Sequence, residues 1–256
     1  PFIWVILNSF KPRGLIRSDT FSLPIGDKFT LENYVTAFKR VDIGTAYVNS
    51  IVISGAVTVV VMVLAGLAAY AMVRYSFRLR GFLHSMIIAS MMFPVFSTII
   101  PVFRMESSWG IVNTGSIWLT RLSVVLPQIA GNLSFAIIVL MGFIRSLPVD
   151  LEEAAYLEGY NVYQIFFRII MPLAKPSFAT VGIFTFLWSY NDLFLQMFFL
   201  RSKKFFTITR LLNEISSQAG TNYGLMVAAV VMVVIPVLVV YIFLQNYIIK
   251  GMTAGA

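Results

Sequence analysis

The stretch from Asp150 to Pro172 reads DLEEAAYLEGYNVYQIFFRIIMP and forms a polar interruption between two strongly apolar stretches. Asp150 is placed to cap a helix by accepting from the backbone N–H of Glu153, and Glu153 can bond the Asp150 N–H in return. Gly159 supplies the left-handed residue that ends this short helix. The pattern therefore predicts a helix, a sharp turn and a second helix that Pro172 interrupts.

A first helix of about two turns is too short to be stable alone in water, so packing must hold it. A groove on a partner protein would do so, with alanines allowing close approach, leucines as apolar anchors and carboxylates meeting basic groups at the rim. These residues are Ala154, Ala155, Leu151, Leu157, Glu152 and Glu158. The alternative is an ordinary capped loop whose acidic side chains are merely solvated.

The composition places the chain in a membrane. It is 59% hydrophobic and 12% charged, whereas soluble domains carry about 25% charged residues. Stretches of about 20 apolar residues can cross a bilayer as helices. We predict an all-α integral membrane protein of about six spans: Ala46 to Val73, Phe82 to Phe103, Ile117 to Ile144, Tyr223 to Ile249, a broken stretch from Pro172 to Leu200, and Phe2 to Phe10 as the outer end of a first span whose beginning is absent.

The sequence contains no recognisable catalytic motif. The sequence has no cysteine and no phosphate-binding loop of the Gly-x-x-x-x-Gly-Lys-Ser/Thr type. His84 is the only histidine, and its place at the start of a predicted span favours an interfacial anchor over a metal ligand. The net charge of +8 is compatible with lipid headgroups and gives no indication of nucleic acid binding. We therefore predict no enzymatic activity and no cofactor in this chain.

Asp192 lies inside an apolar stretch, where a carboxylate costs about 2.5 to 3.5 kcal/mol on insertion scales and should face protein or water. Trp188, Asp192 and Gln196 follow one another at helical spacing, and Gln128 and Asn132 do so on the preceding span. We predict a translocation path between these helices, with aromatic rings that stack on a solute and polar groups that bond its hydroxyls. Its candidate residues are Gln128, Asn132, Trp188, Tyr190, Asn191, Asp192 and Gln196. The alternative is that these polar groups only join helices to each other.

The spacing of Glu153-Ala154-Ala155, Gly159 and Ile169-Ile170-Met171-Pro172 resembles the EAA loop, by which membrane subunits of bacterial ABC importers dock onto their ATPase subunits. Met171 is the one departure, since the family usually has Leu there. The bias of basic residues between the loops does not settle the orientation. We place residues 150–172 in the cytoplasm on the resemblance alone.

The whole chain resembles the smaller six-span permease of the maltose-transporter type, including Leu31-Glu32-Asn33-Tyr34 and the tail from Lys250 to Ala256. The resemblance implies a type I permease fold, with residues 1–256 as a single transmembrane domain in the bacterial inner membrane. It implies a second permease as heterodimer partner, two ATPase subunits that bind ATP and Mg²⁺, an extracytoplasmic sugar-binding protein, and a sugar or oligosaccharide as substrate.

The resemblance also assigns roles to residues. It implies ATPase coupling through Glu152, Glu153, Ala154, Ala155, Leu157, Glu158, Gly159 and Pro172. Within the extracytoplasmic segment 201–222, it implies contact with the binding protein through Gln218, Ala219, Gly220, Thr221 and Asn222. In maltose-type transporters the sugar is held mainly by the other permease, so the polar path here can lack substrate contact.

Two other functions remain open. One is a self-contained secondary transporter or channel that is driven by an ion gradient and uses Asp192 as its coupling carboxylate. The other is an ABC permease for a solute that is not a sugar.

Overall fold

The computed structural model describes residues 2–40, 42–219 and 222–253, which form helices and no strand. The α-helices are α1 (Phe2–Ser9), α2 (Arg13–Ser18), α3 (Glu32–Arg40), α4 (Ile43–Arg74), α5 (Arg80–Ser90), α6 (Val95–Ser108), α7 (Ile117–Ser146), α8 (Asp150–Leu157), α9 (Val162–Ile165), α10 (Met171–Leu173), α11 (Lys175–Asn191), α12 (Leu193–Phe199), α13 (Ile208–Ala219) and α14 (Tyr223–Thr253). Phe166–Ile170 is a π-helical turn, and Gly26–Lys28 and Lys203–Phe205 are short 3₁₀ turns.

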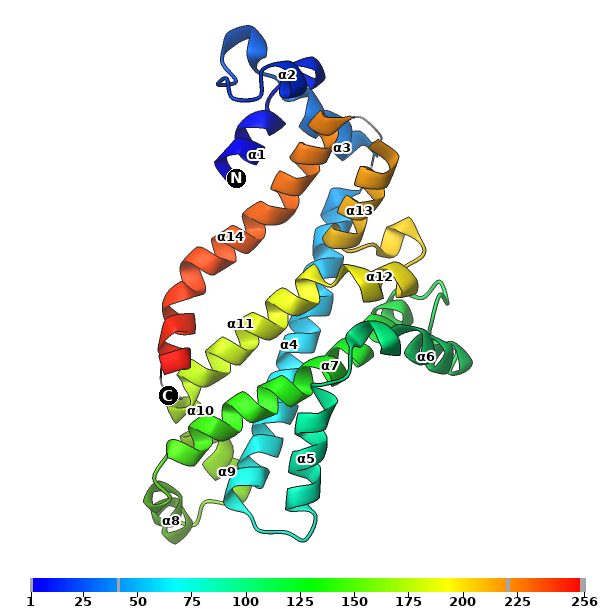
Figure 1. The fold of residues 1–256 in the computed structure, drawn as a ribbon. Helices are drawn as coiled ribbons and strands as arrows, with labels where there is room; N and C mark the ends of the chain where they lie inside the picture. The colour runs from blue at the N-terminus through cyan, green and yellow to red at the C-terminus, as the bar shows by residue number, and fades with distance from the viewer. Residues whose placement is uncertain (1, 41, 220–221, 254–256) are drawn as a thin grey trace.

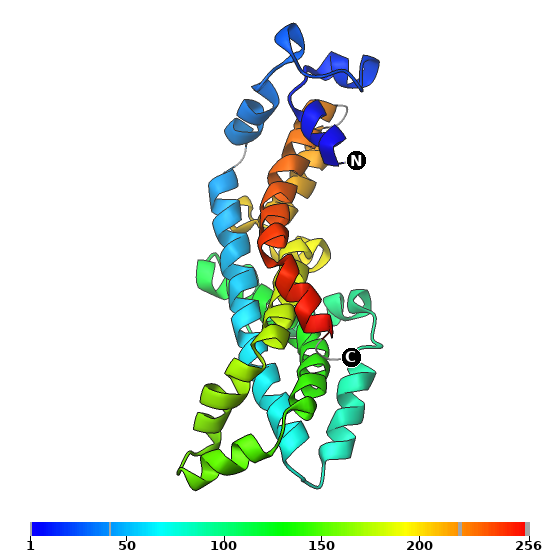
Figure 2. The ribbon, with the colours of Figure 1, turned by 90° about the vertical axis from the view of Figure 1, so that its left-hand side faces the viewer.

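The helices form an elongated molecule with two different ends (Figure 1). Helices α8 and α9 lie at one end, together with the turn that joins α4 to α5. Helices α1, α2 and α3 gather at the other end, on the same side as α13, and the view in Figure 2 agrees. The described residues 150–172 and 201–219 therefore lie toward opposite ends of the molecule, as expected for loops on opposite sides of a membrane.

Two of the predicted spans are single continuous helices. Among the described residues, α4 and α7 are long and apolar enough to cross a membrane. The predicted span from Phe82 to Phe103 is instead bent, since α5 and α6 meet at 105°. Pro94 precedes α6 directly, and a proline restricts the residue before it and has no N–H for a helical bond.

A second bend lies in the stretch from Pro172 to Leu200. The helical segment 162–173 and α11 meet at 82° across Ala174. Up to four spans are present in the described part of the chain if each bent pair crosses as one. Apolar composition predicted one span for each of these stretches, whereas the structure has a pair of helices with a bend between them.

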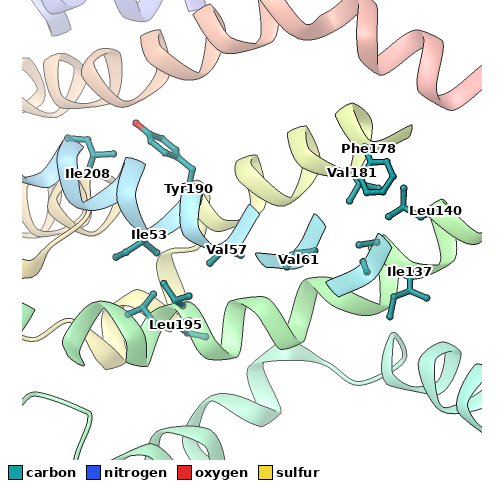
Figure 3. Packing of buried hydrophobic residues seen from close by; sticks show 14 of the residues in the cluster. Ile53, Val57, Val61, Ile137, Leu140, Phe178, Val181, Tyr190, Leu195 and Ile208 are labelled. Atoms are coloured by element: carbon teal, nitrogen blue, oxygen red, sulfur yellow. The ribbon is translucent and has the colours of Figure 1, made fainter. Parts of the chain in front are cut away.

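Helix α4 lies at the centre of the core, packed against α7 and α11 along its length. Its inward face carries Ile53, Val57 and Val61 at four-residue spacing, which places them on one side of the helix. Figure 3 shows α4 between two neighbouring helices, α7, which carries Ile137 and Leu140, and α11, which carries Phe178 and Val181. Within a bilayer such close van der Waals contact between helices is a main source of their association.

Gly66 marks the closest approach along α4. A Cβ atom at this position would lie 2.8 Å from Cζ of Phe178 and 3.0 Å from Cζ of Phe166. Both rings are buried. Glycine is therefore required here by space rather than by backbone conformation.

We expect Gly66→Ala to lower the thermal stability of the purified protein in detergent by about 1 to 3 kcal/mol, because the added methyl overpacks a closed contact. Gly55→Ala is the matched control on the same helix, since nothing lies within 4 Å of a Cβ there. Melting temperatures would check this, and equal values for the two variants would contradict the assigned packing.

Candidate functional site

Helix α8, the first helix of the segment 150–172, begins without the side-chain cap that the sequence predicted. Val149 occupies the N-cap position with helical angles, φ −70° and ψ −29°, and no side chain caps the helix. The N–H groups of Glu152 and Glu153 donate to the Val149 carbonyl at 2.8 and 3.2 Å. The predicted capping box of Asp150 and Glu153 is therefore wrong, because the chain enters α8 without the extended residue that such a cap needs.

The capping box of this loop lies instead at the second helix. Asn161 precedes α9 with extended angles, and its Oδ1 accepts from the N–H of Gln164 at 2.9 Å. The Gln164 side chain accepts from the Asn161 N–H, also at 2.9 Å. The two residues three apart satisfy each other's backbone groups at the start of α9.

The turn at Gly159 is confirmed. Gly159 has φ +86°, the left-handed conformation that glycine adopts without steric cost. Its N–H donates to the carbonyl of Tyr156 at 3.0 Å, and the N–H of Tyr160 donates to that of Ala155 at 3.0 Å. These two bonds close the end of α8 in a Schellman arrangement.

The second helix continues one residue past Pro172 before it bends. Residues Phe166–Ile170 form a π-helical turn, in which the N–H of Met171 donates to the carbonyl of Phe166, five residues back. Such a turn widens the helix just before the proline, whose missing N–H would otherwise interrupt the regular bonding. The helical segment ends after Leu173.

Helix α8 presents two different faces. Leu157 is 91% exposed, and Leu151 is also exposed. Four further residues of the predicted docking set are exposed: Glu153, Ala154, Glu158 and Gly159. Ala155 and Glu152 are buried, so only part of the predicted docking set is available to a partner.

Glu152 faces the interior of this chain, and the expectation that it meets a basic group of a partner does not fit its position. It is 4% exposed. Its Oε1 lies 2.5 Å from Nε of Arg74, and its Oε2 accepts from the hydroxyl of Tyr70 at 2.7 Å. Both partners belong to α4. Neighbouring residues on a helix point in directions about 100° apart, so Glu152 turns inward while Glu153 stays outside.

A pocket of about 440 Å³ lies where α11 ends and α12 begins. It is larger than a second pocket, of about 340 Å³, which lies at the end of the molecule that holds α3. Aromatic rings and polar side chains share the wall of the larger pocket. Its lining residues are Met91, Val95, Phe96, Pro127, Gln128, Gly131, Asn132, Phe135, Trp188, Ser189, Asp192, Phe194 and Leu195. Trp188 is 47% exposed and packs edge-on against Phe135.

Polar groups in this pocket bond one another. Nε2 of Gln128 donates to Oδ2 of Asp192 at 3.0 Å, and the hydroxyl of Ser189 donates to Oε1 of Gln128 at 2.6 Å. Oδ1 of Asp192 accepts from the N–H of Leu195 at 3.1 Å and so caps α12. Nδ2 of Asn132 donates to the carbonyl of Gln128 at 2.7 Å.

The pocket brings together four of the seven predicted path residues: Gln128, Asn132, Trp188 and Asp192. Tyr190 and Gln196 are buried elsewhere, and the side chain of Gln196 bonds the Ser189 carbonyl and the Thr207 hydroxyl. Asn191 is exposed and donates to the Leu187 carbonyl at 2.8 Å. The predicted single helical stripe is wrong beyond Asp192, because the helix breaks there and α12 takes a new direction.

Sequence reasoning missed the aromatic wall of this pocket. Phe135 lies on the face of Asn132, three residues on, and Phe194 follows the break directly. The spacing of Phe135 from Asn132 was the available signal. The position of Phe194 depends on the bend, which the sequence does not define.

The predicted contact segment of residues 218–222 is only partly described. Gln218 and Ala219 belong to the last turn of α13, and Gly220 and Thr221 lie outside the described residues. Asn222 is buried, and its Oδ1 accepts from the N–H of Leu225 at the start of α14 at 3.2 Å. The side chain of Asn222 therefore serves the fold rather than an exposed loop tip.

These features define a helical membrane protein with a helix-turn-helix exposed at one end and a polar, aromatic pocket beside a broken helix. Residues 40–254 match the family of inner membrane components of binding-protein-dependent transport systems. The chain belongs to this family. The predictions of a permease, of its helical fold and of its inner membrane location are thereby confirmed.

Relatives cover the whole chain. It is 34% identical to the diacetylchitobiose uptake system permease NgcG of Streptomyces coelicolor, over 100% of this chain and 82% of the relative. It is 32% identical to the trehalose transport system permease SugB of Mycobacterium tuberculosis, over 100% and 91%. The crystal structure of a bacterial ABC transporter for the import of alginate is similar in fold, with a TM-score of 0.82 at 24% identity over 96% of this chain and 89% of that one.

We expect Gly159→Ala to destabilise the turn by about 1 to 2 kcal/mol, since residues with a Cβ are strained at positive φ. Amide hydrogen exchange over residues 150–161 should become about tenfold faster. Gly142→Ala in α7 is the control, because that glycine has no positive φ and open space around it. Unchanged exchange in the Gly159 variant would show that the turn does not depend on glycine.

Proposed function

We propose that this chain is one permease subunit of an ATP-driven importer for a sugar or oligosaccharide. The family description supports a membrane component that works with a binding protein. The relatives support carbohydrate as the substrate, since their names specify diacetylchitobiose, trehalose, and melibiose, raffinose or stachyose. A second permease, two ATPase subunits that bind ATP and Mg²⁺, and an extracytoplasmic binding protein would complete the assembly.

The observation that carries the coupling role is the exposed face of α8. Leu157 stands almost fully free of this chain at the end of a two-turn helix. Glu153 and Glu158 flank it and are also exposed. Burying one leucine side chain contributes about 1.5 to 3 kcal/mol, so this residue offers a strong anchor for a groove with a basic rim. We place the ATPase on this face.

We expect Leu157→Asp to reduce retention of the ATPase subunits in a pull-down of the tagged permease at least about tenfold, because a charge replaces the apolar anchor. Leu79→Asp is the matched control, because Leu79 is an exposed leucine in the turn that joins α4 to α5, and this turn lies at the same end of the molecule as α8. Equal retention by both variants would sink the assignment of the docking face.

The pocket beside Asp192 is proposed as this chain's share of the translocation path. Trp188 offers a half-exposed ring to an apolar sugar surface, and Gln128 and Asn132 line the same pocket. Asp192 is already engaged, with one oxygen capping α12 and the other bonded to Gln128. This arrangement favours a positioning role for the carboxylate over the ion coupling that a secondary transporter would need.

We expect Asp192→Leu to impair sugar uptake while leaving ATPase retention intact, since the change removes the cap of α12, worth about 0.5 to 2 kcal/mol, far from α8. Asp192→Asn keeps an effective cap and should retain most uptake. Uptake would be measured in cells with the complete importer. Normal uptake by the leucine variant, or uptake by the lone chain from an ion gradient without ATP, would contradict the proposal.

A further inference from the structure

We propose that Glu152 and Arg74 form a buried link that passes the displacement of α8 directly to α4, the central helix of the core. This inference rests on the proposed docking of an ATPase on the exposed face of α8. It assigns positioning roles to two residues that do not themselves touch that partner.

The link joins three elements. Nε of Arg74 lies 2.5 Å from Oε1 of Glu152 in α8, and its Nη2 donates to the carbonyl of Leu147 at 2.9 Å. Leu147 directly follows the last residue of α7. Arg74 is itself the last residue of α4. One guanidinium group therefore holds the ends of α4 and α7 and the first turn of α8 in a fixed relation.

The burial of this link makes it stiff. The side chains of Arg74 and Glu152 are 10% and 5% exposed, and the second carboxylate oxygen accepts from Tyr70 at 2.7 Å. Removing one member of a buried pair leaves the other charge without compensation, so the pair resists separation. A second contact between α8 and the end of α4, from the hydroxyl of Tyr156 to that of Tyr75 at 3.1 Å, is exposed, and water competes with it.

The link gives α8 a route into the core other than the chain itself. Covalently, α8 is joined by short turns to α7 and to α9. Helix α4 comes far earlier in the sequence, and its polar end contacts α8 through Arg74 and Tyr70. Since α7 and α11 both pack on α4, a push on α8 that moves α4 reaches the helices around the pocket.

The decisive experiment uses the complete importer in proteoliposomes with its loaded binding protein, and measures ATP hydrolysed per sugar transported. We expect Glu152→Gln to raise this ratio at least about fivefold while the amount of bound ATPase stays unchanged. Asp150→Asn is the control, because it removes an exposed charge from the same turn of α8. An unchanged ratio for Glu152→Gln would overturn the inference.

A double-mutant cycle separates the link from a general loss of stability. If Arg74 and Glu152 act as one unit, Arg74→Met with Glu152→Gln raises the ratio no further than either change alone. Multiplied effects would overturn the inference. Arg74→Lys keeps the charge but loses the fork that reaches Leu147, so we expect an intermediate ratio.

A milder variant tests the link even if the Glu152→Gln importer fails to assemble with its ATPase. Tyr70→Phe removes only one hydrogen bond of Glu152 and keeps the ion pair, and it should still raise the ratio measurably. An unchanged ratio in an assembled Tyr70→Phe importer, together with loss of ATPase from the Glu152→Gln assembly, would assign Glu152 to docking instead. Absence of any ATPase from the wild-type assembly would refute the proposed function itself.

Discussion

The close packing of α4 between α7 and α11 is the interaction on which the rest of the structure depends. Val57, Val61, Ala65 and Ala69 have no exposed surface, and they let the helices approach along several turns. Lipid tails are as apolar as these side chains, so the contact relies on fit between surfaces rather than on escape from water. Gly66 extends the same contact to the aromatic rings of the loop and of α11. A change in the position of α4 therefore cannot remain local.

Polar side chains tie both ends of α4 to loops. At the N-terminal end of α4, Nδ2 of Asn49 donates to the carbonyls of Lys204 and Phe206 at 3.2 and 3.0 Å. The hydroxyl of Ser50 accepts from the N–H of Ile208 at 2.8 Å. At its C-terminal end, Arg74 and Tyr70 bind Glu152. Buried backbone and charged groups are costly unless bonded, so these contacts fix each loop to the helix. The continuous helix α4 thus connects the segment 201–208 with the segment 150–172.

The sequence alone predicted features that local rules determine, and it failed to predict features that depend on contacts between distant parts of the chain. Apolar length predicted α4 and α7, and the requirement for positive φ predicted the turn at Gly159. It could not tell which of Glu152 and Glu153 turns inward, because both fit the same helix and only Arg74, remote in sequence, distinguishes them. It placed Asp192 on a continuous helix, since the cap that Asp192 gives to α12 appears only once the chain has already bent.

The break at Asp192 bears on the proposal that the pocket is part of a translocation path. Irregular backbone at membrane depth is tolerated where it lines a cavity and finds internal partners, and Asp192 supplies such a partner to α12. The polar groups of the pocket wall are largely hydrogen-bonded to one another. The side chain of Gln128 donates to Asp192 and accepts from Ser189, and its backbone carbonyl accepts from Asn132. In the proposed path, a solute in the pocket would meet aromatic surface and polar groups that are already bonded to each other. We expect such a wall to bind a solute weakly, as a path that must release its solute requires.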